Sequence, residues 1–275
     1  MENHTKTPIK RILLIEPKTP GYHVYSAFMM PRLGMPLLAR IMRGRGYKVE
    51  VYVQDSTRIP ISEIERADLV GVTATTNTVP EAYRIASLAR NKGKPVVMGG
   101  PHVTFMAGEA LRHCDIVVRG EGDETFPELV RAIETGGDLH SVQGISFYRG
   151  GELVNTPDRP LVSNLDSLPP PDLGTVHFGK RLPVIPVQTS RGCPHQCTFC
   201  AVTLMFGHRF RTRSVENVLD ELERYRGRRV FFVDDNFTAN PNRAVRLLQG
   251  MQERGITLKS WSAQARVDVV RRPDL

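Results

Sequence analysis

Residues 189–200 read TSRGCPHQCTFC and place three of the four cysteines of the chain, Cys193, Cys197 and Cys200, on one short stretch. Thiolates at this spacing can supply part of a zinc site, most of the ligands of an iron–sulfur cluster, or a disulfide with one thiol left over. The stretch continues an apolar run, VIPVQTS (184–190), so we expect a strand that leads directly into a cysteine loop.

The composition is that of an ordinary globular protein, with 275 residues of which 40% are hydrophobic and 24% charged. No apolar segment approaches the ~18 residues that span a bilayer, and the first residues, MENHTKTPIK, lack the apolar core of a signal peptide. We therefore expect a cytoplasmic protein with no membrane span. Disulfides are rare in that reducing compartment, which favours metal ligands or redox groups for clustered cysteines.

The net charge of +8 does not by itself indicate a nucleic-acid partner. The basic residues are spread along the chain, and the local group at Arg209, Arg211 and Arg213 has none of the aromatic interleaving that stacks on bases. We expect solvated helix faces and contacts to anionic cofactors, and no nucleic acid.

Strand-like and helical segments alternate along the first half. RILLIEP (11–17), YKVEVYVQ (47–54), ADLVGVTAT (67–75), KPVVMGG (94–100) and DIVVRGEG (115–122) read as buried strands, with helical spacing between them. This pattern predicts a flavodoxin-like, doubly wound parallel sheet of five strands over residues 1–140. No GxGxxG motif follows the first strand, which disfavours a nicotinamide or flavin dinucleotide.

The second half repeats the alternation after a connecting segment. We expect residues 141–182 to form a hairpin around Gly150 and Gly151 followed by a proline-rich linker. Residues 183–275 then show strands at 184–190, 229–236 and 256–266, with helices that begin after Ser214 and Asn240. The cysteine loop is the first β–α loop of this series, and parallel β/α folds place their chemistry at such loops.

An iron–sulfur cluster fits three thiolates better than zinc does. A structural zinc site takes four ligands, and His195 and His208 are weak choices for the fourth. Cys114 follows an amphipathic helix beside an apolar run and reads as a small buried hydrophobe. Three thiolates on a cubane leave one iron open, which suits binding of a small molecule.

The pattern CxxxCxxC with an aromatic residue before the last cysteine resembles the radical S-adenosylmethionine (SAM) superfamily. Together with PRLGMPLLARIMRGRGYKVEVY (31–52), GGPHVT (99–104) and RGEGDETF (119–126), it resembles the subfamily that carries an N-terminal cobalamin-binding domain. The resemblance implies an N-terminal cobalamin domain, a partial radical SAM β/α barrel and three cofactors: a [4Fe–4S] cluster, SAM and cobalamin. It also implies a small-molecule substrate and an electron donor such as flavodoxin or ferredoxin.

The same resemblance assigns roles to residues of this sequence. The cluster ligands would be Cys193, Cys197 and Cys200, and Phe199 would lie near the adenine of SAM. The other residues expected near SAM are Asp234, Asp235, Asn236, Ser262, Gln264 and Arg266. Those expected to hold cobalamin, with no histidine on cobalt, are Thr73, Thr75, Thr76, Gly99, Gly100, Pro101, His102, Thr104, Arg119, Gly120, Glu121 and Gly122.

The resemblance favours reductive cleavage of SAM followed by methyl transfer to an unactivated carbon or phosphorus centre. The alternatives are a radical SAM cyclase or oxidoreductase, and a non-catalytic module that binds a cluster and cobalamin. Because the family barrel has about six β/α units and residues 183–275 supply roughly three, we expect a truncated protein without full turnover of its own. The sequence does not identify the substrate.

Overall fold

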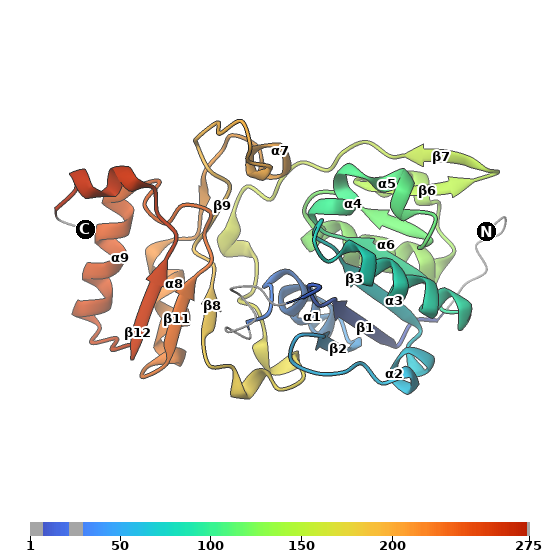
Figure 1. Cartoon of the computed structure of the whole chain (residues 1–275), viewed down its shortest axis with the longest axis horizontal. Coiled ribbons are helices and arrows are strands. Elements are labelled where there is room, and N and C mark those ends of the chain that lie inside the picture. Colours follow the sequence, from blue (N-terminus) through green and yellow to red (C-terminus); the bar gives the residue numbers. More distant parts are fainter. Residues whose placement is uncertain (1–7, 22–29, 274–275) are drawn as a thin grey trace. The chain divides into compact units, whose positions relative to one another are not determined.

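The computed structural model describes residues 8–21 and 30–273. The chain divides into two compact units, each with its own sheet (Figure 1). Unit 1 consists of Met1–Leu161 and Pro171–Arg181, and unit 2 of Val162–Pro170 and Leu182–Leu275. The segments that belong to each unit alternate along the proline-rich passage.

Unit 1 is built on a seven-stranded sheet with the order β2-β1-β3-β4-β5-β6-β7. Its first five strands are parallel, which confirms the predicted doubly wound sheet. The strands are β1 (Arg11–Glu16), β2 (Lys48–Val53), β3 (Leu69–Thr73), β4 (Val96–Gly99), β5 (Ile116–Val118), β6 (Ile145–Arg149) and β7 (Glu152–Asn155).

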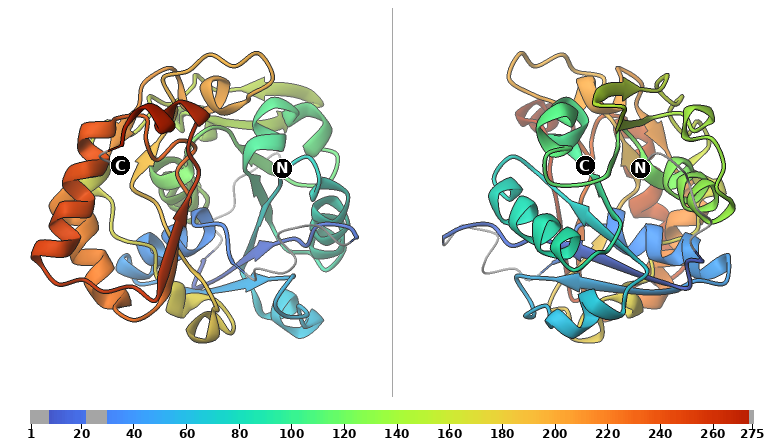
Figure 2. Two further views of the ribbon diagram at one scale, coloured as in Figure 1. Left: turned by 60° about the vertical axis from the view of Figure 1, so that its left-hand side comes forward. Right: turned by 90° about the vertical axis from the view of Figure 1, so that its right-hand side faces the viewer.

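Helices cover both faces of this sheet (Figure 2, right). Helices α1 (Gly34–Gly44) and α6 (Gly122–Thr135) pack on one face, and α2 (Ile61–Arg66), α3 (Val79–Asn91), α4 (Pro101–Phe105) and α5 (Ala107–Ala110) on the other. Along β1 the buried side chains alternate between the two cores: Ile12 and Leu14 join one, Leu13 and Ile15 the other. The continuous apolar run ILLI (12–15) is explained by burial on both faces of the sheet.

The predicted hairpin around Gly150 and Gly151 is confirmed, and it extends the sheet of unit 1. Strand β6 pairs antiparallel with β5, and β7 with β6. Both glycines of the turn have positive φ, of 57° and 84°, as a tight hairpin requires. The proline-rich passage that follows has no α-helix, only the short 3-10 turns Leu165–Ser167, Leu173–Thr175 and Gly179–Arg181.

Unit 2 has a three-stranded parallel sheet of order β12-β11-β8, with β8 (Ile185–Val187), β11 (Arg229–Phe232) and β12 (Ser260–Ala263). Helices α8 (Val215–Leu222) and α9 (Pro241–Glu253) pack against each other and begin at the predicted caps. Ser214 accepts from the backbone N–H of Asn217, and Asn240 from that of Arg243. The remaining elements are α7 (Val202–Phe206), the short strands β9 (Ser190–Arg191) and β10 (Arg211–Thr212), and the 3-10 turns Leu139–Ser141, Glu223–Tyr225 and Val267–Arg271.

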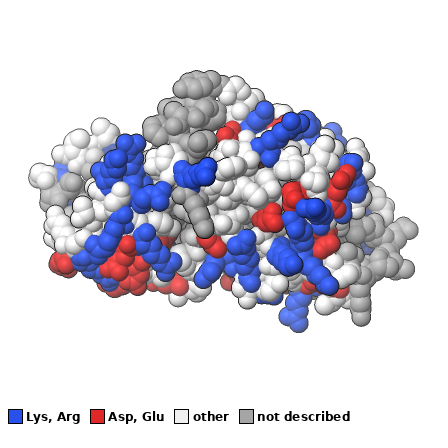
Figure 3. All heavy atoms as spheres, turned by 90° about the horizontal axis from the view of Figure 1, so that it is seen from below, with Lys and Arg blue, Asp and Glu red and all other residues white. Residues whose placement is uncertain are grey.

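The basic side chains on the face in Figure 3 form several separate groups, with acidic side chains between some of them. In the part of the chain that the structure describes, no helix is long and apolar enough to cross a membrane.

Candidate functional site

The cysteine loop is closed at its base by a short antiparallel pair. Arg191 of β9 pairs with Arg211 of β10, so residues 192–210 leave and return at the same place. Gly192 begins the loop with φ +82°, and a Cβ there would lie 2.6 Å from the carbonyl oxygen of Arg209. Only glycine fits this close approach without strain.

Cys193, Cys197 and Cys200 are free thiols of intermediate exposure on this loop. The backbone N–H of Cys200 donates to the carbonyl of Cys197 at 3.0 Å, which forms a turn between them. Phe199, in that turn, is 91% exposed. Three reduced, half-exposed thiols fit the donor set of a [4Fe–4S] cluster with one open iron. Across residues 8–21 and 30–273, no three His, Cys, Asp or Glu side chains are grouped closely enough to hold a metal ion.

Asp234 follows β11 and is 1% exposed. Its carboxylate accepts the backbone N–H groups of Thr189 and Ser190, at 2.7 and 2.9 Å, and the hydroxyl of Thr189 at 2.5 Å. Arg243 donates to the Thr189 hydroxyl and carbonyl, at 3.0 and 3.1 Å. Burial raises the pKa of Asp234 more than these hydrogen bonds lower it. This carboxylate therefore holds the strand end from which the cysteine loop starts.

Asp235 and Asn236 differ from Asp234 in exposure or in hydrogen-bond partners. Asp235 is exposed beside the loop; desolvation and the neighbouring Asp234 raise its pKa, while a hydrogen bond from the Gly192 N–H lowers it. Asn236 is 3% exposed, and its side-chain oxygen accepts from the Thr238 hydroxyl at 3.1 Å. Of the three predicted SAM contacts after β11, only Asp235 presents an exposed carboxylate.

The three polar residues predicted on the third strand, Ser262, Gln264 and Arg266, are all exposed. Ser262 lies within β12, and Gln264 follows it, with its carbonyl accepting from the Phe237 N–H at 2.8 Å. Arg266 comes nearest to the cysteines: its Nη1 lies 4.0 Å from the Sγ of Cys197. The structure thus places one cationic side chain beside a predicted cluster ligand.

The loops after β3 and β4 of unit 1 are tied together. Gly100 has φ +99°, and a Cβ there would lie 2.7 Å from the Oγ1 of Thr73. The Nδ1 of His102 lies 3.2 Å from the Oγ1 of Thr76. The Oγ1 of Thr104 accepts from the backbone N–H of Gly120, in the loop after β5, at 3.1 Å. The predicted cobalamin loops therefore form one connected edge, to which Thr75, Gly99, Pro101, Glu121 and Gly122 also belong.

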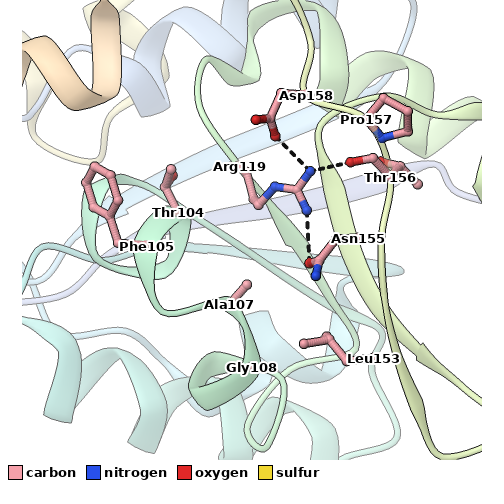
Figure 4. Close-up of a pocket in the computed structure, with 10 residues that line it drawn as sticks. All are labelled: Thr104, Phe105, Ala107, Gly108, Arg119, Leu153, Asn155, Thr156, Pro157 and Asp158. Atoms are coloured by element: carbon pink, nitrogen blue, oxygen red, sulfur yellow. Dashed lines mark hydrogen bonds and ion pairs between the residues drawn. The ribbon is translucent and has the colours of Figure 1, made fainter.

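Arg119 is fully engaged within unit 1 (Figure 4). Its guanidinium donates to Asn155 at 3.0 Å and to Asp158 at 2.9 Å, and also to Ser146 and to the carbonyls of Ile145 and Thr156. These bonds fasten the hairpin and the chain after it to β5. The same arginine borders a pocket of about 520 Å³ whose walls come from the α4–α5 segment and residues 153–158.

Two residues of this edge were not predicted. Glu16, the last residue of β1, is 3% exposed and accepts from the backbone N–H of Arg32 at 2.8 Å. The Nη1 of Arg32 lies 3.3 Å from the same carboxylate. The one sequence signal is a glutamate that directly follows the apolar run ILLI (12–15).

Two protein families match this chain over separate segments. The B12 binding domain matches residues 23–130, and the radical SAM superfamily matches residues 187–265. The chain therefore belongs to the radical SAM proteins that carry an N-terminal B12-binding domain. This membership confirms the predicted family.

Curated proteins and solved structures are similar to this chain over most of its length. An uncharacterized methyltransferase of Pyrococcus horikoshii is 39% identical over 86% of this chain and 56% of its own length. The anaerobic magnesium-protoporphyrin IX monomethyl ester cyclase of Rubrivivax gelatinosus is 30% identical over 78% and 42%. The solved structure of the radical SAM methyltransferase TsrM of Kitasatospora setae shares the fold, with a TM-score of 0.68 at 20% identity over 90% of this chain and 51% of that one. The chain spans about half the length of the curated relatives it matches.

Proposed function

We propose that this protein is a cobalamin-dependent radical SAM enzyme that transfers a methyl group to an unactivated carbon or phosphorus centre of a small molecule. One observation carries the proposal. A CxxxCxxC loop follows the first strand of a parallel β/α unit, in the same chain as a doubly wound sheet of the B12-binding family.

The residues of this chain have separate tasks in the proposal. Cys193, Cys197 and Cys200 hold a [4Fe–4S] cluster, which when bound supplies the electron that cleaves SAM, while cobalamin supplies the methyl carrier. Asp235 is the exposed carboxylate beside the loop and is suited to accept a hydrogen bond from the SAM amino group. Phe199, exposed within the loop, offers a ring face to the adenine.

The cobalamin site of the proposal is the carboxyl edge of β3, β4 and β5. Hydroxyl side chains and glycine backbone at such an edge can approach the amide groups and nucleotide tail of a corrinoid closely. Fold position supports this choice, because ligands of doubly wound sheets bind beyond the carboxyl ends of the strands.

The proposed reductive cleavage of SAM needs an electron from a separate donor protein. We propose a flavodoxin or a ferredoxin as the donor, and the cytoplasm as the compartment. The four cysteines are all free thiols, which suits a reducing compartment.

A ring-forming reaction is the second candidate. The cyclase of Rubrivivax gelatinosus supports it, since its identity to this chain, 30%, extends over most of the same residues. The methyltransferase of Pyrococcus horikoshii, at 39%, favours methyl transfer.

Anaerobic reconstitution with iron and sulfide tests the proposal. We expect cluster absorption in the wild-type chain, its loss in Cys→Ala variants at 193, 197 and 200, and its retention in the matched Cys114→Ala variant. Cys114 is a suitable control because it is 2% exposed in the core of unit 1, where burial raises its pKa to about 12. Bound zinc without iron would overturn the proposal.

Two further readouts separate the reaction classes. Methyl-labelled SAM and cobalamin are added to the reconstituted protein with a reduced flavodoxin. Transfer of the label to cobalamin supports methyl transfer, whereas 5'-deoxyadenosine with no label transfer supports the cyclase class. A cluster that never responds to SAM would favour a non-catalytic binding module.

A further inference from the structure

Glu16 is a buried carboxylate that was not among the residues predicted to contact a cofactor. It ends β1 with 4% of its side chain exposed, next to the end of β3 in the sheet. Burial raises its pKa to about 7, although Arg32 opposes the shift. An apolar residue at this strand end would cost less, because an isolated buried carboxylate is unfavourable. The polar group therefore has a positional role.

The group that Glu16 positions is Arg32. The carboxylate binds both the backbone N–H and the Nη1 of Arg32, which fixes the start of the chain into α1 and the direction of the guanidinium. The Nη2 of Arg32 lies 3.4 Å from the Oγ1 of Thr75, in the loop after β3. The guanidinium therefore lies over the carboxyl ends of two adjacent strands, β1 and β3.

The guanidinium has donors to spare. Its bonds to Glu16 and Thr75 engage one nitrogen each, and 40% of the Arg32 side chain is exposed. Arginine has five N–H donors in a fixed plane, a geometry that matches phosphate and carboxylate oxygens. Within the described residues, the remaining donors of Arg32 have no protein acceptor, so they are open to a ligand at this edge.

We propose that Arg32 binds the phosphate of the cobalamin nucleotide tail and is held for that task by Glu16. The inference rests on the proposed function, because it takes cobalamin as the ligand of this edge. The peripheral side chains of a cobalamin are neutral amides, and its phosphodiester is the anionic group that a guanidinium would select. The hydroxyl of Thr75 accepts from Arg32 and donates to the Oδ1 of Asn77 at 2.5 Å, so it helps to hold the guanidinium in place.

The test compares two corrinoids that differ by the phosphate: cobinamide and cobinamide phosphate. Their dissociation constants are measured by absorbance with the wild-type chain, with Arg32→Met and with Arg40→Met. Arg40 is a matched control, because it lies exposed on α1. We expect Arg32→Met to weaken binding of cobinamide phosphate about 10- to 100-fold, the range for loss of a charge-assisted hydrogen bond, and to leave cobinamide unchanged. Arg40→Met should change neither.

Each result of this comparison supports or overturns the role proposed for Arg32. Equal weakening of both corrinoids by Arg32→Met would show a role in loop shape and overturn the inference, and so would no weakening of either. A wild-type chain that binds neither corrinoid would overturn the proposed cobalamin site, and the inference with it. If Arg32→Met does not fold, the double variant Glu16→Leu, Arg32→Met removes the buried carboxylate as well. In that variant, selective loss of the phosphate ester supports the inference, and unchanged selectivity overturns it.

Discussion

Replacement of Asp234 by alanine separates a scaffold role from a ligand role. The carboxylate accepts from the backbone N–H groups of Thr189 and Ser190 and from the Thr189 hydroxyl, and Arg243 lies next to this cluster. All four residues are buried. Asp234→Ala leaves two N–H groups without an acceptor and Arg243 without a counter-charge.

The expected cost is a large part of the stability of a domain. Each orphaned buried donor costs roughly 1–3 kcal/mol, and removal of one partner from a buried charged cluster about 3–5 kcal/mol. These values overlap rather than add, so we expect a loss of about 4 kcal/mol out of the ~5–15 kcal/mol typical of a domain. Because burial raises the pKa of Asp234, the neutral Asp234→Asn should cost less, about 2 kcal/mol.

Denaturant unfolding of unit 2, followed by the fluorescence of Trp261, measures this loss of stability. The iron content after reconstitution shows whether the cysteine loop still binds a cluster. Asp235→Ala is the matched control, since its carboxylate is exposed and should change stability little while weakening SAM binding. An Asp234→Ala protein that unfolds at the wild-type denaturant concentration yet fails to bind SAM would refute the reasoning.

Three further predictions follow from single residues. Glu16 has a pKa of about 7 in the fold and about 4.5 unfolded, so the native state holds its proton more tightly. Stability should therefore fall by about 3 kcal/mol as pH rises from about 4.5 to above 7, and Glu16→Gln should flatten that slope in urea unfolding at several pH values. Gly192→Ala, with its Cβ 2.6 Å from the Arg209 carbonyl, should reduce cluster retention and cost about 2 kcal/mol; wild-type iron content would contradict this. Gly100→Ala, 2.7 Å from Thr73, should weaken cobalamin binding and lower the Tm, and an unchanged dissociation constant would count against it.

Local sequence signals predicted the parts of the fold that depend on residues close together in the sequence. The apolar runs located the parallel strands, and Ser214 and Asn240 were correctly expected to cap α8 and α9. The predicted burial of Cys114 is confirmed as well. These features depend on residues within one or two turns of each other, which a single sequence displays directly.

The long-range contacts around the candidate site could not be predicted from the sequence. Arg119 was predicted to hold cobalamin, and the sequence did not show that its guanidinium also binds residues of the hairpin and beyond, up to 39 positions away. Asp234 was grouped with its two neighbours, although its partner Thr189 lies 45 positions earlier. No periodicity reports such pairings, because they arise only when separate strands are brought side by side.

Glu16 and Asp234 reveal a shared design in the two units. Each is a buried carboxylate at the end of a parallel strand, and each binds the backbone of a segment that leads to an exposed group. Glu16 positions Arg32, and Asp234 fixes the start of the cysteine loop. A charged residue at the end of an apolar run is therefore ambiguous in the sequence. It can contact a cofactor itself, or it can position another residue that does. In this structure both carboxylates are 1–3% exposed and accept hydrogen bonds from backbone N–H groups of their own units, and no local pattern in the sequence reports these bonds.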